Sequence, residues 1–147
     1  MSKLAVPPDN EEFVLNVSYE EAMWIEKSNP GWKYLGPKFK SGQTYNYKNA
    51  RLVRLGSNSL REAIQKADEL GFRLLGSHAV NSFRHTYFPD ANGSVVFGGP
   101  EWQSPDGEAV VSYCHGENSF WNLNVSYSGG FRGFGYNCRW AVVSKSC

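Results

Sequence analysis

The sequence has little net charge and no long apolar run, and each absence excludes a class of protein. Fifteen Lys and Arg stand against 14 Asp and Glu, which leaves a formal net charge of +1. A nucleic-acid-binding surface needs an excess of cations to neutralise phosphates, so we expect no nucleic-acid partner. No apolar stretch approaches the roughly 18 residues of a spanning helix, so we expect no membrane insertion.

The first residues also lack the features of a secretory signal. Residues 1–12 carry one Lys and a short apolar stretch that Pro7 and Pro8 interrupt. This pattern predicts a loose N-terminal leader rather than a signal peptide. We therefore expect the chain in the cytoplasm, or displayed on a virion or cell surface through another protein.

Cysteine is scarce, and its spacing fits neither a disulfide framework nor a zinc site. Cys114, Cys138 and Cys147 are odd in number and form no CxxC pair. For Cys114 and Cys138 two interpretations stay open, a bond between neighbouring strands or two buried free thiols; the missing secretion signal favours the thiols. His78 and His85 are seven residues apart, which is not a usual metal-ligand spacing. No metal and no cofactor is predicted, and both histidines are expected at the surface or in hydrogen bonds.

Aromatic residues and glycine, by contrast, are abundant. Five Trp, eight Tyr and nine Phe make up 15% of the chain, and 15 Gly accompany them. Disordered segments are poor in aromatics, and 147 residues are enough to bury the core of one domain. The sequence therefore predicts a single folded domain over residues 13–147, in which Trp102 is expected to pack in the core.

Two capped helices are predicted in the first half. Ser18 and Glu21 have the spacing of a capping box, and the helix that they begin ends at Asn29-Pro30-Gly31. Ser59 and Glu62 repeat the pattern before a helix with apolar residues three and four apart, which Gly71 closes. No helical period returns after Gly76. Strands are expected at residues 13–17, 50–55, 72–75, 94–97, 109–114, 120–125 and 138–143. The expected class is α+β, with a loop-rich antiparallel β C-terminal half.

The segment of residues 113–137 has an unusual composition. Asn, Ser, Tyr and Gly dominate it, and Glu117 and Arg132 are its only charged residues. Tyr gives rigid contact area with a polar tip, while Ser, Asn and Gly give adaptable hydrogen bonds, as in antibody binding loops. A catalytic site would instead concentrate carboxylates, His or Lys. The alternative interpretation is an ordinary turn-rich β region, since the same residues favour turns.

The order of these features resembles a known family. Two capped helices precede GGPEWQSPDGEAVVSYCHG, a hairpin rich in Trp and Asn, and FRGFGYNCRWAVV. The chain resembles the compact C-type lectin fold of bacterial, archaeal and phage proteins, and above all the variable proteins of diversity-generating retroelements. In that family a reverse transcriptase rewrites adenines, so an AAY codon for Asn becomes Tyr, Ser, Gly, His or Asp, but never Trp or Glu.

The resemblance implies a non-enzymatic ligand-binding module with a hypervariable surface, whose ligand is expected to be a protein. Trp121 and Trp140 would be the fixed scaffold of the site, and Glu117 would be fixed as well. Calcium-dependent sugar binding is not expected, because the chain lacks the gathered carboxylates that hold calcium. The implied variable, ligand-binding positions are Tyr113, His115, Asn118, Ser119, Asn122, Asn124, Ser126, Tyr127, Ser128, Tyr136 and Asn137.

Other functions stay open as alternatives. The same fold without hypervariation would suit a phage or cell-surface receptor-binding structural protein. A small enzyme would need a deep pocket with converging titratable groups. Cys114 and His115 do not suit it as nucleophile and base, because neighbours on a strand point to opposite faces. Basic residues interleaved with Tyr between positions 33 and 54 would suit nucleic acid, but a solvated face explains them as well.

Overall fold

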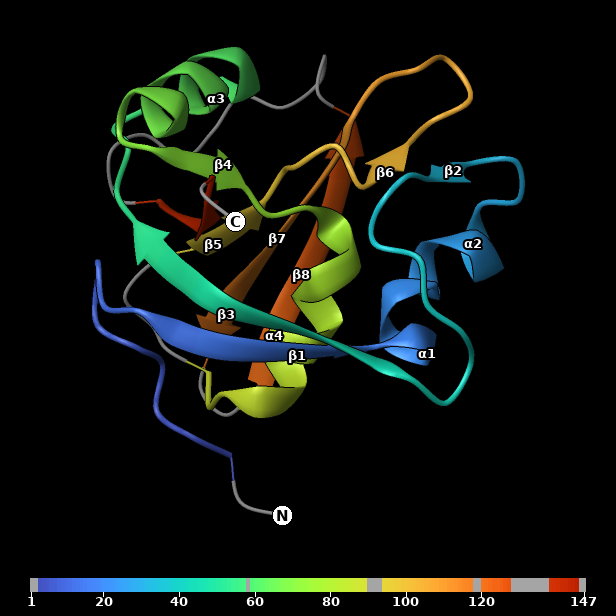
Figure 1. Cartoon of the computed structure of the whole chain (residues 1–147), viewed down its shortest axis with the longest axis horizontal. Helices are drawn as coiled ribbons and strands as arrows, with labels where there is room; N and C mark the ends of the chain where they lie inside the picture. The colour runs from blue at the N-terminus through green and yellow to red at the C-terminus, as the bar shows by residue number, and fades with distance from the viewer. Residues whose placement is uncertain (1–2, 58, 90–93, 118–119, 128–137, 146–147) are drawn as a thin grey trace.

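The computed structural model describes residues 3–57, 59–89, 94–117, 120–127 and 138–145. Within them the chain forms a mixed α and β fold with a curled sheet and short helices, in agreement with the predicted α+β class (Figure 1). The helices are α1 (Tyr19–Ala22), α2 (Trp24–Ser28), α3 (Leu60–Glu69), α4 (Val80–Thr86) and the 3-10 turn η1 (Ser77–Ala79). The strands are β1 (Phe13–Ser18), β2 (Lys33–Tyr34), β3 (Thr44–Val53), β4 (Phe72–Leu74), β5 (Ser94–Phe97), β6 (Trp102–Gln103), β7 (Val110–Glu117), β8 (Phe120–Tyr127) and β9 (Arg139–Ser144).

The main sheet has seven strands in the order β1-β3-β9-β5-β7-β8, and β4 also pairs with β9. Strands β2 and β6 form a separate pair. The pairing of β5 with β9 is parallel, whereas the other strand pairs are antiparallel. The expectation of an antiparallel C-terminal half therefore holds for β5–β7 and β7–β8 and is wrong for β5–β9. A short local motif does not encode the direction of a strand whose paired residues are 44 positions away, as Val95 and Arg139 are.

Both faces of the central strands are buried, because helices cover them from opposite sides. In β9, Trp140 and Val142 belong to a core cluster with residues of α3, while Ala141 and Val143 belong to a cluster with residues of α4 and η1. This alternation follows from the two-residue period of a strand. A strand that is apolar at every position is typical of a sheet covered on both faces.

The two predicted helix starts are confirmed. Ser18 accepts a hydrogen bond from the Glu21 backbone N–H at 3.2 Å, and the Glu21 carboxylate accepts one from the Ser18 N–H, which completes the capping box. The helix is then interrupted at Met23, which divides it into α1 and α2. Ser59 caps α3 through the Glu62 N–H at 3.1 Å.

The sequence prediction missed α4 and η1, which lie after Gly76. Val80 and Phe83 are fully buried on the sheet, so tertiary packing stabilises a segment with few strong helix formers. Trp102 is buried as expected, and its indole N–H donates to the Ala22 carbonyl at 2.9 Å.

Residues 3–12, expected as a loose leader, make defined contacts with the domain. The backbone of Leu4 exchanges hydrogen bonds with Thr86 and Phe88, at 2.9 and 2.8 Å. Further along, the Asn10 N–H donates to the Leu52 carbonyl at 2.8 Å. This part of the leader therefore runs from the C-terminal end of α4 to the start of β1, beside the end of β3 (Figure 1).

Candidate functional site

The strand pair β7–β8 carries the predicted binding residues, and its register places three of them together. Tyr113 and His115 are two residues apart on β7, and Asn122 of β8 is the direct partner of His115. Residues directly opposite each other in an antiparallel pair share a face, as do residues two apart on one strand. Tyr113, His115 and Asn122 are each partly exposed on that face.

The opposite face of the same two strands is built into the core. Ser112 and Cys114 are fully buried, and the Ser112 hydroxyl donates to the Ser77 hydroxyl at 2.8 Å. On β8, Trp121 is 7% exposed, and its indole N–H donates to the Tyr87 carbonyl at 3.0 Å. Around Tyr113, His115 and Asn122 the strand pair therefore has one buried face and one partly exposed face, whereas Val111, on the same side as Tyr113, is fully buried.

The partly exposed face is tied to the domain at its base. Tyr113 packs against the cluster that contains Trp140 and the residues of α3. Ser94 of β5 lies 3.5 Å from the His115 ring, between its Oγ and Nδ1 atoms. Trp140 itself is fully buried. Tyr113 is therefore partly buried against the core and partly exposed to solvent. The contact with the core restricts which side chains fit at this position.

The remaining predicted positions are described less completely. For three of them the structure gives the backbone register: Asn124 pairs with Tyr113, Ser126 with Val111 and Tyr127 with Val110. The other five lie outside the described residues. These are Asn118, Ser119, Ser128, Tyr136 and Asn137.

The cysteines within the described ranges are buried free thiols. Cys114 and Cys138 are not bonded to each other, in keeping with the interpretation that the sequence favoured. Burial raises the pKa of the Cys114 thiol to about 12, so it carries almost no thiolate at neutral pH. Cys114 faces the core and the neighbouring His115 faces the other way, as expected, and the two do not form a nucleophile–base pair.

A second polar cluster, which the sequence prediction missed, lies inside the domain. His78 is 1% exposed, and its Nε2 atom lies 2.6 Å from the Tyr47 hydroxyl. Its Nδ1 atom lies 4.0 Å from the buried Glu101 carboxylate, which accepts a hydrogen bond from Arg73 at 3.1 Å. These residues come from β3, η1, β4 and the segment before β6, so no local motif marks them. By contrast, His85 is exposed and lies 2.6 Å from the Glu21 carboxylate.

Burial controls the protonation of this cluster. It lowers the pKa of His78 to about 3, with the Arg73 charge acting in the same direction. Burial raises the pKa of Glu101, while Arg73 opposes that shift. The glycines at positions 76 and 99 are required here, because a Cβ atom on either would overlap the Glu101 side chain. The cluster is thus a neutral imidazole held against an arginine–glutamate pair.

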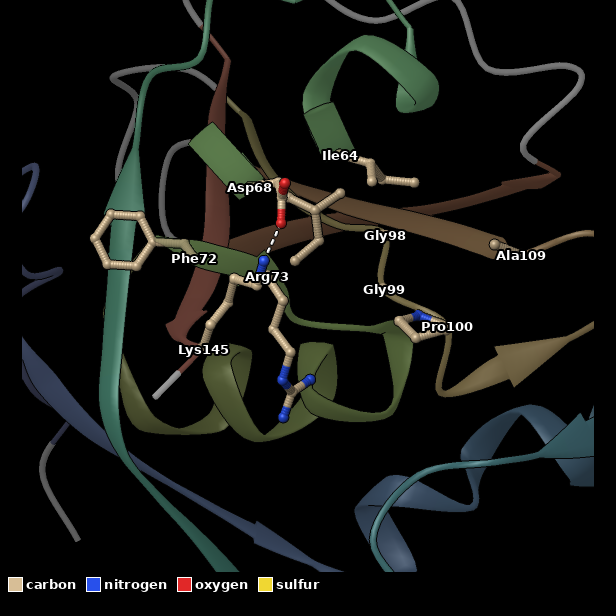
Figure 2. A pocket seen from close by; sticks show the side chains of 10 residues that line it. Ile64, Asp68, Phe72, Arg73, Gly98, Gly99, Pro100, Ala109 and Lys145 are labelled. Atoms are coloured by element: carbon tan, nitrogen blue, oxygen red, sulfur yellow. Dashed lines mark hydrogen bonds and ion pairs between the residues drawn. The ribbon is translucent and has the colours of Figure 1, made fainter. Parts of the chain in front are cut away.

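A pocket of about 330 Å³ lies between α3, β4 and the turn at residues 98–100 (Figure 2). Its walls are mainly apolar and include Ile64, Leu74 and Pro100. At its rim Asp68 pairs with Lys145, and Figure 2 shows the Arg73 guanidinium directed away from that pair. The pocket has the size and lining of a small-molecule site, but its charged side chains are engaged in ion pairs with protein partners.

No protein-family model, no curated protein and no solved structure gives a match to this chain. In the part of the chain that the structure describes, three or more His, Cys, Asp or Glu side chains nowhere gather as metal ligands would. No helix in that part has the length and apolar character needed to cross a bilayer. The function is therefore inferred from the geometry of the chain's own residues.

Proposed function

We propose that the chain is a non-enzymatic ligand-binding module with a C-type-lectin-like fold, which displays a variable surface on the β7–β8 side, as in the variable proteins of diversity-generating retroelements. One observation carries the proposal. The register of β7 and β8 separates the partly exposed Tyr113, His115 and Asn122 from the buried Ser112, Cys114 and Trp121. Tyr113, His115 and Asn122, which the proposal takes as variable, thus alternate with positions that packing holds fixed. The register does not extend this alternation to Tyr127, because its partner Val110 lies on the side of the ladder that holds Ser112 and Cys114.

This separation is what a diversified binding surface requires. Replacing a fully buried side chain leaves a cavity or an overpacked site, which costs about 1–5 kcal/mol of stability. Replacing a partly exposed polar side chain costs about 0.5 kcal/mol or less. Where the strand pair alternates in this way, its partly exposed positions can vary while the domain still folds.

The chemistry of the exposed positions suits a protein ligand. Tyr supplies a large contact area with a hydroxyl tip, and Asn and His supply both donors and acceptors. None of the three is a carboxylate, a lysine or an arginine. Such a surface binds through shape and hydrogen bonds, and the near-zero net charge adds little long-range attraction.

A second candidate is a receptor-binding structural protein of a phage or cell surface, with the same fold and no hypervariation. The gene neighbourhood separates the two. The retroelement interpretation requires a near-copy of the 3′ end of the gene beside a reverse transcriptase, with mismatches confined to adenines. Absence of that copy would leave the receptor-binding interpretation.

Two matched libraries on the same strands test the proposed surface. The first randomises His115, Asn122 and Asn124, and the second randomises Ser112, Cys114 and Leu123. Both are displayed on yeast, digested with protease to remove unfolded members, and panned on immobilised lysozyme as a model protein target. We expect most members of the first library to resist protease and some to bind, whereas most members of the second should be digested.

The comparison is matched because Asn122 and Asn124 flank Leu123 in the chain, and each library changes three neighbouring positions. Similar protease sensitivity in the two libraries would mean that both faces are structural. A first library that folds but yields no binder to lysozyme or to further immobilised proteins would argue against a binding role for this face.

A further inference from the structure

The strand β3 is paired along only part of one edge. Strand β1 pairs with it from Thr44 to Ala50, on one side. On the other side β9 pairs with it from Ala50 to Val53 only. Within the described ranges no strand pairs with residues 44–49 on that second side. Alternate backbone N–H and C=O groups of this edge are therefore available to a further strand.

Within the described residues, β9 does not continue its pairing along this edge. After Val143, which pairs with Ala50, continued pairing along β3 would take Ser144 to Asn49, and that pair does not form. On its other edge β9 pairs with β4 from Val142 to Ser144, and the Lys145 N–H donates to the Gly71 carbonyl at 3.0 Å. A hollow of about 190 Å³ lies beside the edge of β3, lined by residues 45–49, Arg73, Val143 and Ser144.

The hollow is positively charged. Lys48 and Arg73 line it, and no carboxylate does. Arg73 is 44% exposed and uses one guanidinium nitrogen for Glu101, which leaves further N–H donors on the same fork. The next cation along β3 is Arg51, which forms an ion pair with Glu12 and does not line the hollow.

Aromatic rings form one wall. The Tyr45 and Tyr47 rings lie 4.8 Å apart between centroids, and Tyr45 is 39% exposed. Tyr47 is fixed in place because its hydroxyl is bonded to His78 inside the domain. A side chain of an added strand that points toward this wall meets an apolar ring surface with a hydroxyl tip.

We infer that residues 44–49 of β3 form a docking edge for an extended acidic peptide segment, which adds as a strand in line with β9. Main-chain hydrogen bonds supply the binding, and Lys48 and Arg73 select carboxylate side chains. A second copy of this chain is a poorer occupant, because edge-to-edge pairing would bring the Lys48 side chains of both copies together, and edge lysines act against such pairing. The inference is independent of the function proposed for β7–β8.

The test uses the full chain and a fluorescein-labelled octapeptide of alternating Glu and Val, with binding followed by fluorescence anisotropy. We expect saturable binding with a Kd in the range of about 1 µM to 1 mM. The same peptide N-methylated at alternate backbone nitrogens should not bind, because it cannot complete the ladder. Hydrogen exchange should show new protection of amides within residues 44–49 on binding.

Charge reversal provides the matched variants. Lys48→Glu should weaken binding by about tenfold or more, whereas Lys38→Glu, which makes the same charge change outside the hollow, should change the Kd by less than about twofold. Both lysines are exposed, so neither substitution should unfold the domain.

Four results would overturn the inference. The first is that the acidic peptide does not bind at about 1 mM. The second is that the N-methylated peptide binds equally well, because binding would then come from general charge attraction and not from main-chain hydrogen bonds. The third is a single-stranded oligonucleotide that competes with the peptide and binds more tightly, since that would make nucleic acid the occupant. The fourth is a concentration-dependent dimer with residues 44–49 protected, which would make a second copy the occupant.

Discussion

The variant His78→Gln tests whether a neutral imidazole is held inside the domain. In the native protein His78 is buried, its Nε2 atom faces the Tyr47 hydroxyl, and its Nδ1 atom faces Glu101. Tyr47, whose pKa burial raises, remains a hydroxyl and shares a hydrogen bond with the neutral ring. Glutamine also offers an acceptor to Tyr47, but it does not titrate.

The sign and size of the effect follow from the lowered pKa. The pKa of His78 is about 3 in the folded protein against an ordinary value of 6.5 for histidine, so below pH 6.5 the unfolded chain binds a proton that the folded chain does not. Stability must then fall as pH falls through this window, by about 1.4 kcal/mol for each pH unit. Between pH 7 and pH 5 the loss through His78 is about 2 kcal/mol, which is a large share of a typical domain stability.

The assay is urea unfolding followed by tryptophan fluorescence at pH 7, 6 and 5. We expect the difference in unfolding free energy between the native protein and His78→Gln to shrink by about 2 kcal/mol over that range. Other groups, including Glu101 with its raised pKa, contribute to both curves. The control Asn122→Gln, on the partly exposed face of the strand pair, should keep the native pH slope, because neither asparagine nor glutamine titrates. Parallel curves for the native protein and His78→Gln would refute the reasoning, because His78 would then titrate alike in the folded and unfolded states.

Three further predictions concern the core. Trp121→Phe should lower the unfolding free energy by about 1–3 kcal/mol in urea titrations, because the buried Tyr87 carbonyl loses its donor; an unchanged midpoint would contradict this. Gly99→Ala should destabilise the domain by more than Gly107→Ala, since a Cβ at Gly99 would meet backbone and Glu101 whereas Gly107 faces open space at a φ of +82°; equal melting temperatures would count against the close packing. Cys114 should resist iodoacetamide in the native protein at pH 8 and react in urea, as peptide mass spectrometry can show; rapid native labelling would mean that its thiol is accessible.

The helices that could be predicted are those that carry their own start and stop signals. Ser59 with Glu62, and Gly71 at a φ of +85°, mark the two ends of α3 in local sequence. The segment of α4 has no side-chain cap, and Asn81, Ser82 and Thr86 are weak helix formers. It is a helix because Val80 and Phe83 are buried in the core, and that packing involves residues far away in the chain.

Strands were predicted where their residues are apolar and missed where they are polar. Ser94–Phe97 is fully buried and has the predicted bounds. In β3 the prediction began at Ala50, because the preceding residues 44–49 are polar and mostly exposed. A register shift between β1 and β3 lets both Tyr47 and Ala50 face the core although they are three residues apart. Because of this three-residue spacing, the sequence does not show the regular alternation of buried and exposed residues that marks a strand.

The β7–β8 strand pair and the buried polar cluster also differ in whether the sequence alone could reveal them. The composition of residues 113–137 drew attention to the hairpin, because a run of Asn, Ser and Tyr is visible in one stretch of sequence. The cluster of Tyr47, His78 and Glu101 is assembled from three separate segments, and only pairing and helix packing bring them within a few ångströms. Composition can indicate a contiguous surface, but it cannot indicate contacts between distant residues.

The central place of β9 has a consequence for how the chain reaches its native state. Strands β3 and β5 do not pair with each other, and each pairs with β9, which follows them by 86 and 42 residues counted from strand end to strand start. Until residues 139–144 leave the ribosome, both strands have unpaired inner edges and the two core clusters lack their shared wall. Folding that waits for such distant contacts is slow, on the order of milliseconds to seconds. During synthesis the unfinished sheet therefore depends on chaperones or on low local concentration to avoid pairing with other chains.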